Sequence, residues 1–225
     1  MSKLYLIPTP IGNLEDITLR SLRILKEVDL ILAEDTRHTK KLLNKYSINT
    51  QLSSFHSHNE HKITKKIVNK IKEGFTYALV SDAGTPGISD PAFLLVRECI
   101  TNELEVDCLP GPTAFVPALI NSGIPSNQFI FEGFLPVKKG RNKRLNSLKG
   151  EKKTMIFYES PHRITRLLDE FVAIFGETRY ASISREISKV FQETTRGSLK
   201  DLVLEFTKNK AKGEFVIIVH GSCEK

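Results

Sequence analysis

The sequence predicts an α/β protein of two domains: an N-terminal doubly wound parallel sheet and a C-terminal mixed α/β domain. In the first half, short apolar runs alternate with helical patterns, an order typical of parallel sheets covered by helices. Pro110-Gly111-Pro112 interrupts the chain near its middle, and the patterns after it are more mixed. Because 225 residues suffice for two small domains, we expect them at 1–112 and 113–225.

The N-terminal domain is expected to alternate strands with helices. Strands are predicted at four apolar runs: 3–7, 30–33, 77–80 and 105–109. Helices are predicted between them, at the stripe of Leu19, Leu22 and Leu25, through Leu42-Leu43, over 61–72 and over about 91–101. The third helix has Ile at every fourth position and ends before Gly74, which suits a helix C-terminus.

The C-terminal domain is expected to be mixed, with strands at 128–134, 154–158, 180–184, 190–195 and 215–219. The third and fourth strands could form an antiparallel pair. Ser160-Pro161 supplies an N-cap and first residue for a helix that ends at Gly176. Ser198 and Asp201 resemble a capping box that opens a second helix.

Composition is that of an ordinary soluble protein, with 40% hydrophobic and 26% charged residues. We find no secretory signal pattern and no apolar run long enough for a bilayer, so a cytoplasmic protein is expected. Three cysteines without a CxxC pair also fit a reducing compartment: Cys99, Cys108 and Cys223. The histidines between His56 and His61 have no partner cluster elsewhere, so no metal site is expected.

Positive charge is concentrated in one segment. The chain carries a net charge of +7, and residues 137–153 contain eight basic residues against the single acid Glu151, which is also +7. Such a segment suits either a polyanion partner or a solvated surface loop. The candidate RNA-binding residues are Lys138, Lys139, Arg141, Lys143 and Arg144, together with Arg163 further along the chain.

Five turn-rich loops sit where predicted strands end: 8–13, 34–37, 81–91, 110–114 and 159–163. In a doubly wound sheet, loops after parallel strands meet at one edge, where ligands bind. The richest in Gly and Pro, 81–91, could be a ligand loop or only a tight strand-to-helix turn. The sequence lacks the P-loop, the GxGxxG fingerprint after the first strand and the GxSxG nucleophile elbow.

Together these segments resemble a known family. They include Ala33-Glu34-Asp35-Thr36-Arg37, the 81–91 loop, Pro110-Gly111-Pro112-Thr113-Ala114 and Phe157-Tyr158-Glu159-Ser160-Pro161-His162-Arg163. In this order they are similar to the ribosomal small-subunit RNA methyltransferase I family, a branch of the tetrapyrrole-methylase-like, class III methyltransferases. The resemblance runs from about Lys3 to Gly221.

The resemblance implies an S-adenosylmethionine cofactor in a cleft between two α/β domains, usually in a homodimer. It implies 2′-O-methylation of a cytidine in the decoding region of 16S rRNA, with the small ribosomal subunit as partner and no membrane. Matching motifs carry the cofactor-binding role to Pro10, Asp82, Ala83, Gly84, Thr85, Ile88, Thr113, Ala114, Tyr158 and Glu159.

A ribose hydroxyl must lose its proton during such a transfer, so a carboxylate base is expected nearby. Glu34, Asp35, Glu159 and Glu186 are candidates, and we take Glu34 and Asp35 as the catalytic pair, with Arg37 free to grip a phosphate. Two other functions stay open. One is C-methylation of a tetrapyrrole on the same fold, and the other is a catalytically silent module that binds the ribosome.

Overall fold

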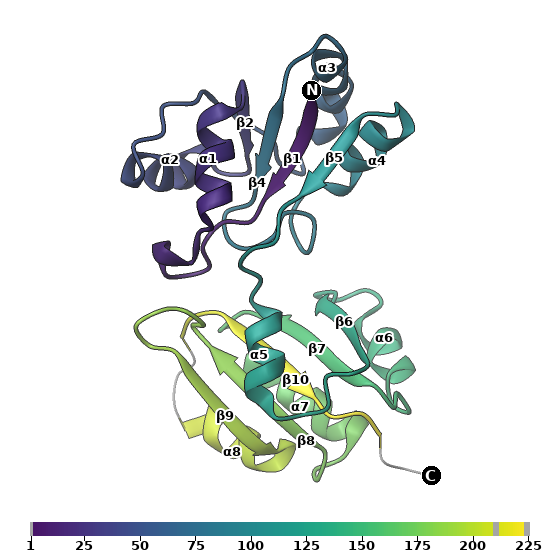
Figure 1. Ribbon diagram of the computed structural model, residues 1–225. Helices are drawn as coiled ribbons and strands as arrows, with labels where there is room; N and C mark the ends of the chain where they lie inside the picture. Colours follow the sequence, from purple (N-terminus) through teal and green to yellow (C-terminus); the bar gives the residue numbers. More distant parts are fainter. Residues whose placement is uncertain (1, 209–211, 223–225) are drawn as a thin grey trace. The chain divides into compact units, whose positions relative to one another are not determined.

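The computed structural model describes residues 2–208 and 212–222 and divides the chain into two compact units, each with its own sheet (Figure 1). Unit 1 is Met1–Thr113 and unit 2 is Ala114–Lys225, so the division lies one residue beyond the expected boundary.

Unit 1 is a parallel five-stranded sheet with helices on both faces (Figure 1). The strand order is β3-β2-β4-β1-β5, and every neighbouring pair is parallel. The strands are β1 (Lys3–Ile7), β2 (Leu30–Ala33), β3 (Leu52–Ser54), β4 (Tyr77–Val80) and β5 (Glu105–Cys108). The helices are α1 (Leu19–Glu27), α2 (Thr36–Lys45), α3 (Glu60–Lys72) and α4 (Phe93–Thr101).

Alternation along the strands divides the core of unit 1 into two layers. Leu4 and Leu6 of β1 pack in one layer with α3 and α4, while Ile7 packs in the other with α1 and α2. This confirms the doubly wound arrangement that the sequence predicted. The short strand β3 was not predicted, because two of its three residues are serines and it pairs only at the edge, with β2.

Unit 2 is a mixed sheet in the order β6-β7-β10-β8-β9, in which only β6 and β7 are parallel. The strands are β6 (Phe129–Phe134), β7 (Thr154–Glu159), β8 (Tyr180–Arg185), β9 (Glu193–Ser198) and β10 (Phe215–Val219). The helices are α5 (Phe115–Ser122), α6 (Arg141–Ser147), α7 (Ile164–Phe175) and α8 (Leu199–Lys208).

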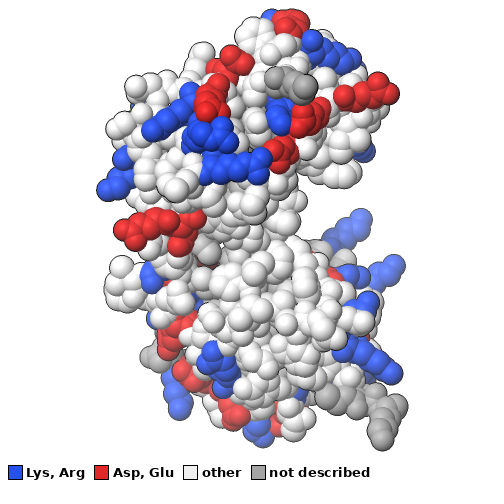
Figure 2. Space-filling model, viewed as in Figure 1, with Lys and Arg blue, Asp and Glu red and all other residues white. Residues whose placement is uncertain are grey.

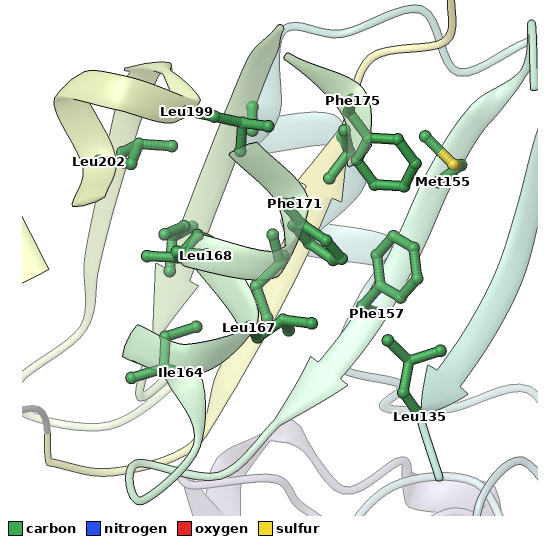
Figure 3. Close-up of a cluster of buried hydrophobic side chains, with 14 of the residues drawn as sticks. Leu135, Met155, Phe157, Ile164, Leu167, Leu168, Phe171, Phe175, Leu199 and Leu202 are labelled. Atoms are coloured by element: carbon green, nitrogen blue, oxygen red, sulfur yellow. The ribbon is translucent and has the colours of Figure 1, made fainter. Parts of the chain in front are cut away.

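The core of unit 2 lies between its sheet and helices α7 and α8 (Figure 3). Phe157 of β7 contacts Phe171 of α7 at 4.8 Å between ring centroids, and Phe171 contacts Phe175 at 5.2 Å. Helix α5 packs against β8, β9 and β10.

Unit 2 differs from the prediction at three elements. Strand β9 begins at Glu193 rather than 190, and Val190 and Phe191 are exposed in the preceding loop. Helices α5 and α6 were not predicted. Helix α5 is apolar on most sides and lies between Pro- and Gly-rich segments, while α6 has seven residues, too few to show a helical period.

Cys99 is buried and Cys108 exposed, and both are free thiols, whereas Cys223 lies outside the described residues. Within those residues we find no helix long and apolar enough to cross a membrane. The same residues contain no group of three or more His, Cys, Asp or Glu side chains arranged to hold a metal ion.

Candidate functional site

The loops that follow β1 and β4 are joined by a hydrogen-bonded bridge. Thr9 and Gly84 exchange two backbone hydrogen bonds of 2.9 Å. The Thr9 hydroxyl donates to the Ser81 carbonyl at 3.0 Å, and the Ser81 hydroxyl donates to the Gly84 carbonyl at 2.9 Å. Pro10 lies directly after this bridge and is half-buried. The first and third of the predicted ligand loops therefore form one rigid structure.

A third loop, after β5, is fastened to the same structure. The Thr85 hydroxyl donates to the Pro112 carbonyl at 3.1 Å and lies 2.5 Å from the Thr113 hydroxyl. A Cβ added at Gly111 would lie 2.7 Å from Cβ of Pro8, so only glycine allows this approach. Three of the five expected loops thus interlock at the carboxyl edge of the parallel sheet.

The Ser81–Pro91 loop turns twice through left-handed backbone. Gly84 has φ +87° and Gly87 has φ +85°, conformations that other residues rarely adopt. Ala83 and Ile88 are exposed on this loop, with Ile88 40% exposed, and Asp82 is half-buried. The loop therefore presents backbone, the carboxylates of Asp82 and Asp90, and an apolar side chain to a ligand.

A small cavity lies below this edge, with a volume of about 30 Å³. Thr39 lines it and is 2% exposed, and its hydroxyl has no hydrogen-bond partner among the described residues. The cavity has room for a water molecule or two but not for a cofactor. Its lining residues are Thr9, Pro10, Leu14, His38, Thr39, Leu42, Ser81 and Asp82.

Three carboxyl groups influence one another at this edge. The pKa of Glu34 is raised by burial and by the negative charge of Asp82, while His56 opposes the shift. The pKa of Asp90 is raised to about 6 by burial and by the charges of Glu34 and Asp82. Asp90 therefore exchanges its proton near pH 6. Sequence reasoning missed Asp90, although it stands before Pro91 at the end of the glycine loop.

Asp35 and Arg37 form an ion pair. Arg37 Nη2 lies 2.7 Å from Asp35 Oδ2, and Arg37 N donates to Asp35 Oδ1 at 2.8 Å, which caps α2. The Arg37 guanidinium holds the pKa of Asp35 far below its usual range. Asp35 N donates to Asp82 Oδ1 at 3.1 Å. Asp35 is therefore a poor proton acceptor, whereas the strongly exposed Arg37 can reach a ligand.

The predicted residues of β7 and the loop after it lie in an ion-pair cluster of unit 2. The Glu159 carboxylate is buried, with Oε1 2.7 Å from Arg163 Nη2 and Oε2 3.8 Å from Arg141 Nη2. Arg141 is 2% exposed and lies 2.7 Å from Oε2 of Glu170. Buried carboxylates and guanidinium groups of this kind hold the local structure together.

This burial changes the roles expected of two residues. Arg141 has no access to a phosphate at the surface, so it is removed from the RNA-binding set. Glu159 is already paired, so it suits positioning of the neighbouring Tyr158 better than direct contact with a cofactor. Tyr158 lies beside Phe131 and Phe134, with ring centroids at 5.1 and 5.5 Å.

The rest of the basic segment divides into paired and unpaired groups. Arg144 pairs with Glu132, with Nη2 2.5 Å from Oε1. Lys138, Lys139 and Lys143 are exposed and form no ion pair within the described residues. Glu186, another expected base, lies 2.8 Å from Lys189 Nζ, and this cation lowers its pKa.

The chain is similar to proteins of known family. Residues 3–203 match the model of the Tetrapyrrole (Corrin/Porphyrin) Methylases. Ribosomal RNA small subunit methyltransferase I of Thermotoga maritima is 49% identical over 221 residues, covering 98% of this chain and 99% of that protein. The protein of that name from Halalkalibacterium halodurans is 50% identical and covers 99% of this chain and 77% of its own length.

Solved structures share the fold at low identity. The methyltransferase CobJ has a TM-score of 0.74 at 20% identity, covering 100% of this chain and 96% of its own. A uroporphyrin-III C-methyltransferase from Thermus thermophilus, solved with S-adenosylhomocysteine, has a TM-score of 0.66 at 17% identity, covering 97% of each chain. The chain therefore has the tetrapyrrole methylase fold and belongs to the tetrapyrrole methylase family, within it to the ribosomal RNA small subunit methyltransferase I group.

Proposed function

We propose that the protein transfers a methyl group from S-adenosylmethionine to the 2′-hydroxyl of a cytidine in the decoding region of 16S rRNA. One observation carries this proposal: identities near 50% extend over almost the whole chain to proteins named ribosomal RNA small subunit methyltransferase I. The partner is then the small ribosomal subunit or its RNA, and the enzyme works in the cytoplasm as a homodimer.

The cofactor-binding residues in this proposal lie mostly on the interlocked loops of unit 1. The backbone turns at Gly84 and Gly87 allow close approach. The exposed Ile88 and the Asp82 carboxylate of the same loop suit a ligand that carries both an apolar ring and an ammonium group. When bound, S-adenosylmethionine supplies an electrophilic methyl group. The proposed set is Pro10, Asp82, Ala83, Gly84, Thr85, Ile88, Thr113, Ala114 and Tyr158, with Glu159 as a positioning residue.

Glu34 is the proposed proton acceptor for the ribose hydroxyl. Burial and Asp82 raise its pKa, which makes it a stronger base than the ion-paired Asp35. Arg37 is the proposed phosphate contact, because its side chain is 88% exposed. Holding the hydroxyl in line with the methyl carbon is worth on the order of 7–11 kcal/mol in favourable systems.

Lys138, Lys139 and Lys143 are the proposed contacts to the RNA backbone. They are exposed and form no ion pair within the described part of the chain, so their charge is available to phosphates. Arg144 and Arg163 share their charge with Glu132 and Glu159, which makes them weaker contributors.

The test is transfer of labelled methyl from S-adenosylmethionine to small subunits purified from cells that lack this protein. Uroporphyrinogen is tested as a substrate in parallel, because one protein of the same fold is a uroporphyrin-III C-methyltransferase. Label on 16S rRNA supports the proposal. Label on the tetrapyrrole alone, or cofactor-independent binding to the subunit without transfer, contradicts it.

A further inference from the structure

A bulge in β6 places Phe134 on the same face of the unit 2 sheet as Phe129 and Phe131. Phe131 pairs with Ile156, on the face opposite the core residue Phe157. The register shifts between Phe131 and Gly133, so that Phe134 pairs with Tyr158. Simple alternation would have pointed Phe134 toward the core. The bulge, with Gly133 at φ +60°, places it on the face of Phe131 instead.

Together with Phe115 and Tyr158, these three side chains form a row of five aromatic rings in contact. Phe115 of α5 lies 6.0 Å from Phe129 and 5.1 Å from Phe131, between ring centroids. Phe131 lies 5.1 Å from Tyr158, which lies 5.5 Å from Phe134. Phe129 and Phe134, at the two ends of the row, are 41% and 53% exposed. We call these five residues the ring surface.

Unpaired positive charge follows the ring surface along the chain. Lys138 follows Phe134 by four residues, a backbone span of at most about 14 Å, and Lys139 and Lys143 lie close by in the chain. In Figure 2 the blue groups along the right side of unit 2 adjoin an uncharged surface, at the place where Figure 1 shows β6 and α6. An apolar face with a cationic edge is complementary to bases joined by phosphates.

We propose that the ring surface binds unpaired nucleotides of the substrate RNA, with bases stacked on Phe129 and Phe134 and phosphates held by Lys138, Lys139 and Lys143. The inference rests on the proposed function and narrows its substrate to single-stranded RNA. Duplex bases are already stacked on one another, so exposed rings gain little from them. Every unpaired base offers a face for stacking.

Phe134→Leu and Phe129→Leu test this surface, because leucine keeps the apolar character and removes the ring. Phe93→Leu is the matched control, since Phe93 is 67% exposed on α4 of unit 1. Fluorescence anisotropy measures the affinity for a labelled oligocytidine and for a hairpin duplex of equal length. Circular dichroism confirms that each variant is folded.

Each ring variant is expected to weaken oligocytidine binding by about 5- to 100-fold. Duplex affinity, S-adenosylmethionine affinity and sedimentation should match the wild type, and Phe93→Leu should change nothing. Unchanged oligocytidine affinity overturns the inference. So does an equal loss of cofactor affinity, which assigns the rings to the cofactor, or dissociation of a dimer, which assigns them to a second copy.

The methyl-transfer assay separates this inference from the proposed function. If the wild type transfers no methyl to rRNA but the ring variants still lose oligocytidine affinity selectively, the proposed reaction fails and the binding surface stands. If the wild type transfers methyl and both ring variants bind and react equally well, the ring surface fails and the reaction stands.

Discussion

Glu34 and Asp35 are adjacent in the sequence, but their surroundings shift their pKa values in opposite directions. Asp35 caps α2 and is paired with Arg37, and that cation holds its pKa low. Glu34 is half-buried near Asp82 and Asp90, and its pKa is raised. The sequence could place both at the end of a strand. It could not rank them, because the pKa of Glu34 depends on its burial and on Asp82, which is remote in the chain.

Replacing Glu34 should therefore affect the chemical step more than replacing Asp35. Glu34→Gln is expected to lower the single-turnover rate by about 10²- to 10⁴-fold, with S-adenosylmethionine affinity retained. Asp35→Asn keeps a good N-cap side chain and should retain most of the activity. If both variants kept full turnover with the cofactor bound, this segment would have no catalytic role. If only Asp35→Asn were inactive, the base would be Asp35.

Asp90 should make stability depend on pH. Its pKa in the folded protein, about 6, exceeds the ordinary 3.8, so the folded state binds this proton more tightly than the unfolded state. The contribution is therefore most favourable below about pH 4 and is lost as pH rises toward 6. Asp90→Asn should stabilise the protein at pH 7 by about 1–2 kcal/mol, allowing for partial exposure.

Urea unfolding of wild type and Asp90→Asn at several pH values measures this effect. The difference in the free energy of unfolding should grow between pH 4 and pH 6 and then stay constant. A difference that does not change with pH would mean that Asp90 is not buried among like charges.

The loops of unit 1 that carry most of the proposed cofactor-binding residues are joined closely to one another. Three interlocked loops are held by Thr9, Ser81 and Thr85 through hydrogen bonds to backbone. The content of glycine and proline was enough to predict these loops from the sequence. Which loops bond to one another could not be predicted, because that depends on the register of β1, β4 and β5 in the sheet.

Gly111→Ala tests the closest of these approaches. The added Cβ would meet Cβ of Pro8 at 2.7 Å, so we expect a loss of about 1–3 kcal/mol in the free energy of unfolding and weaker cofactor binding. Gly150→Ala is the matched control, since nothing lies within 4 Å of its added Cβ. Denaturant unfolding and calorimetry measure the two effects. Equal stability of the two variants would refute the proposed contact.

Helix α6 carries basic residues with opposite roles. Arg141 is buried between Glu159 and Glu170, whereas Lys143, two residues on, is exposed. Arg141→Met should cost about 3 kcal/mol of stability, because it removes the buried cation between Glu159 and Glu170. Lys143→Met should leave stability nearly unchanged and weaken RNA binding. The reverse pattern in thermal unfolding and RNA titration would show that the two roles are assigned wrongly.

The structure of α6 also explains a limit of sequence reasoning. In the sequence, the eight basic residues between 137 and 153 form one charged segment. In the structure Arg141 is buried and bonded to Glu170 of α7, 29 residues away. Charge composition counts cations but does not show which of them are neutralised by distant acids. The strands and helices of unit 1 were easier to predict, since their apolar patterns are local.

For the whole molecule, the number of cations that contact phosphates should set how RNA affinity responds to salt. Replacing Lys138, Lys139 and Lys143 together by glutamine removes three unpaired cations. With a contribution of about 0.7 per phosphate contact on a single strand, the slope of log affinity against log salt should become shallower by about 2. Titration at several salt concentrations measures it, and an unchanged slope would place the RNA elsewhere.

The central claim is that the methyl group goes to a ribose oxygen of 16S rRNA. It is tested most directly by alkaline hydrolysis of rRNA labelled by the protein with S-adenosylmethionine. Alkaline cleavage needs a free 2′-hydroxyl, so a 2′-O-methyl group should leave the label in a dinucleotide that begins with cytidine. Label in mononucleotides would mean methylation of a base and would contradict the account.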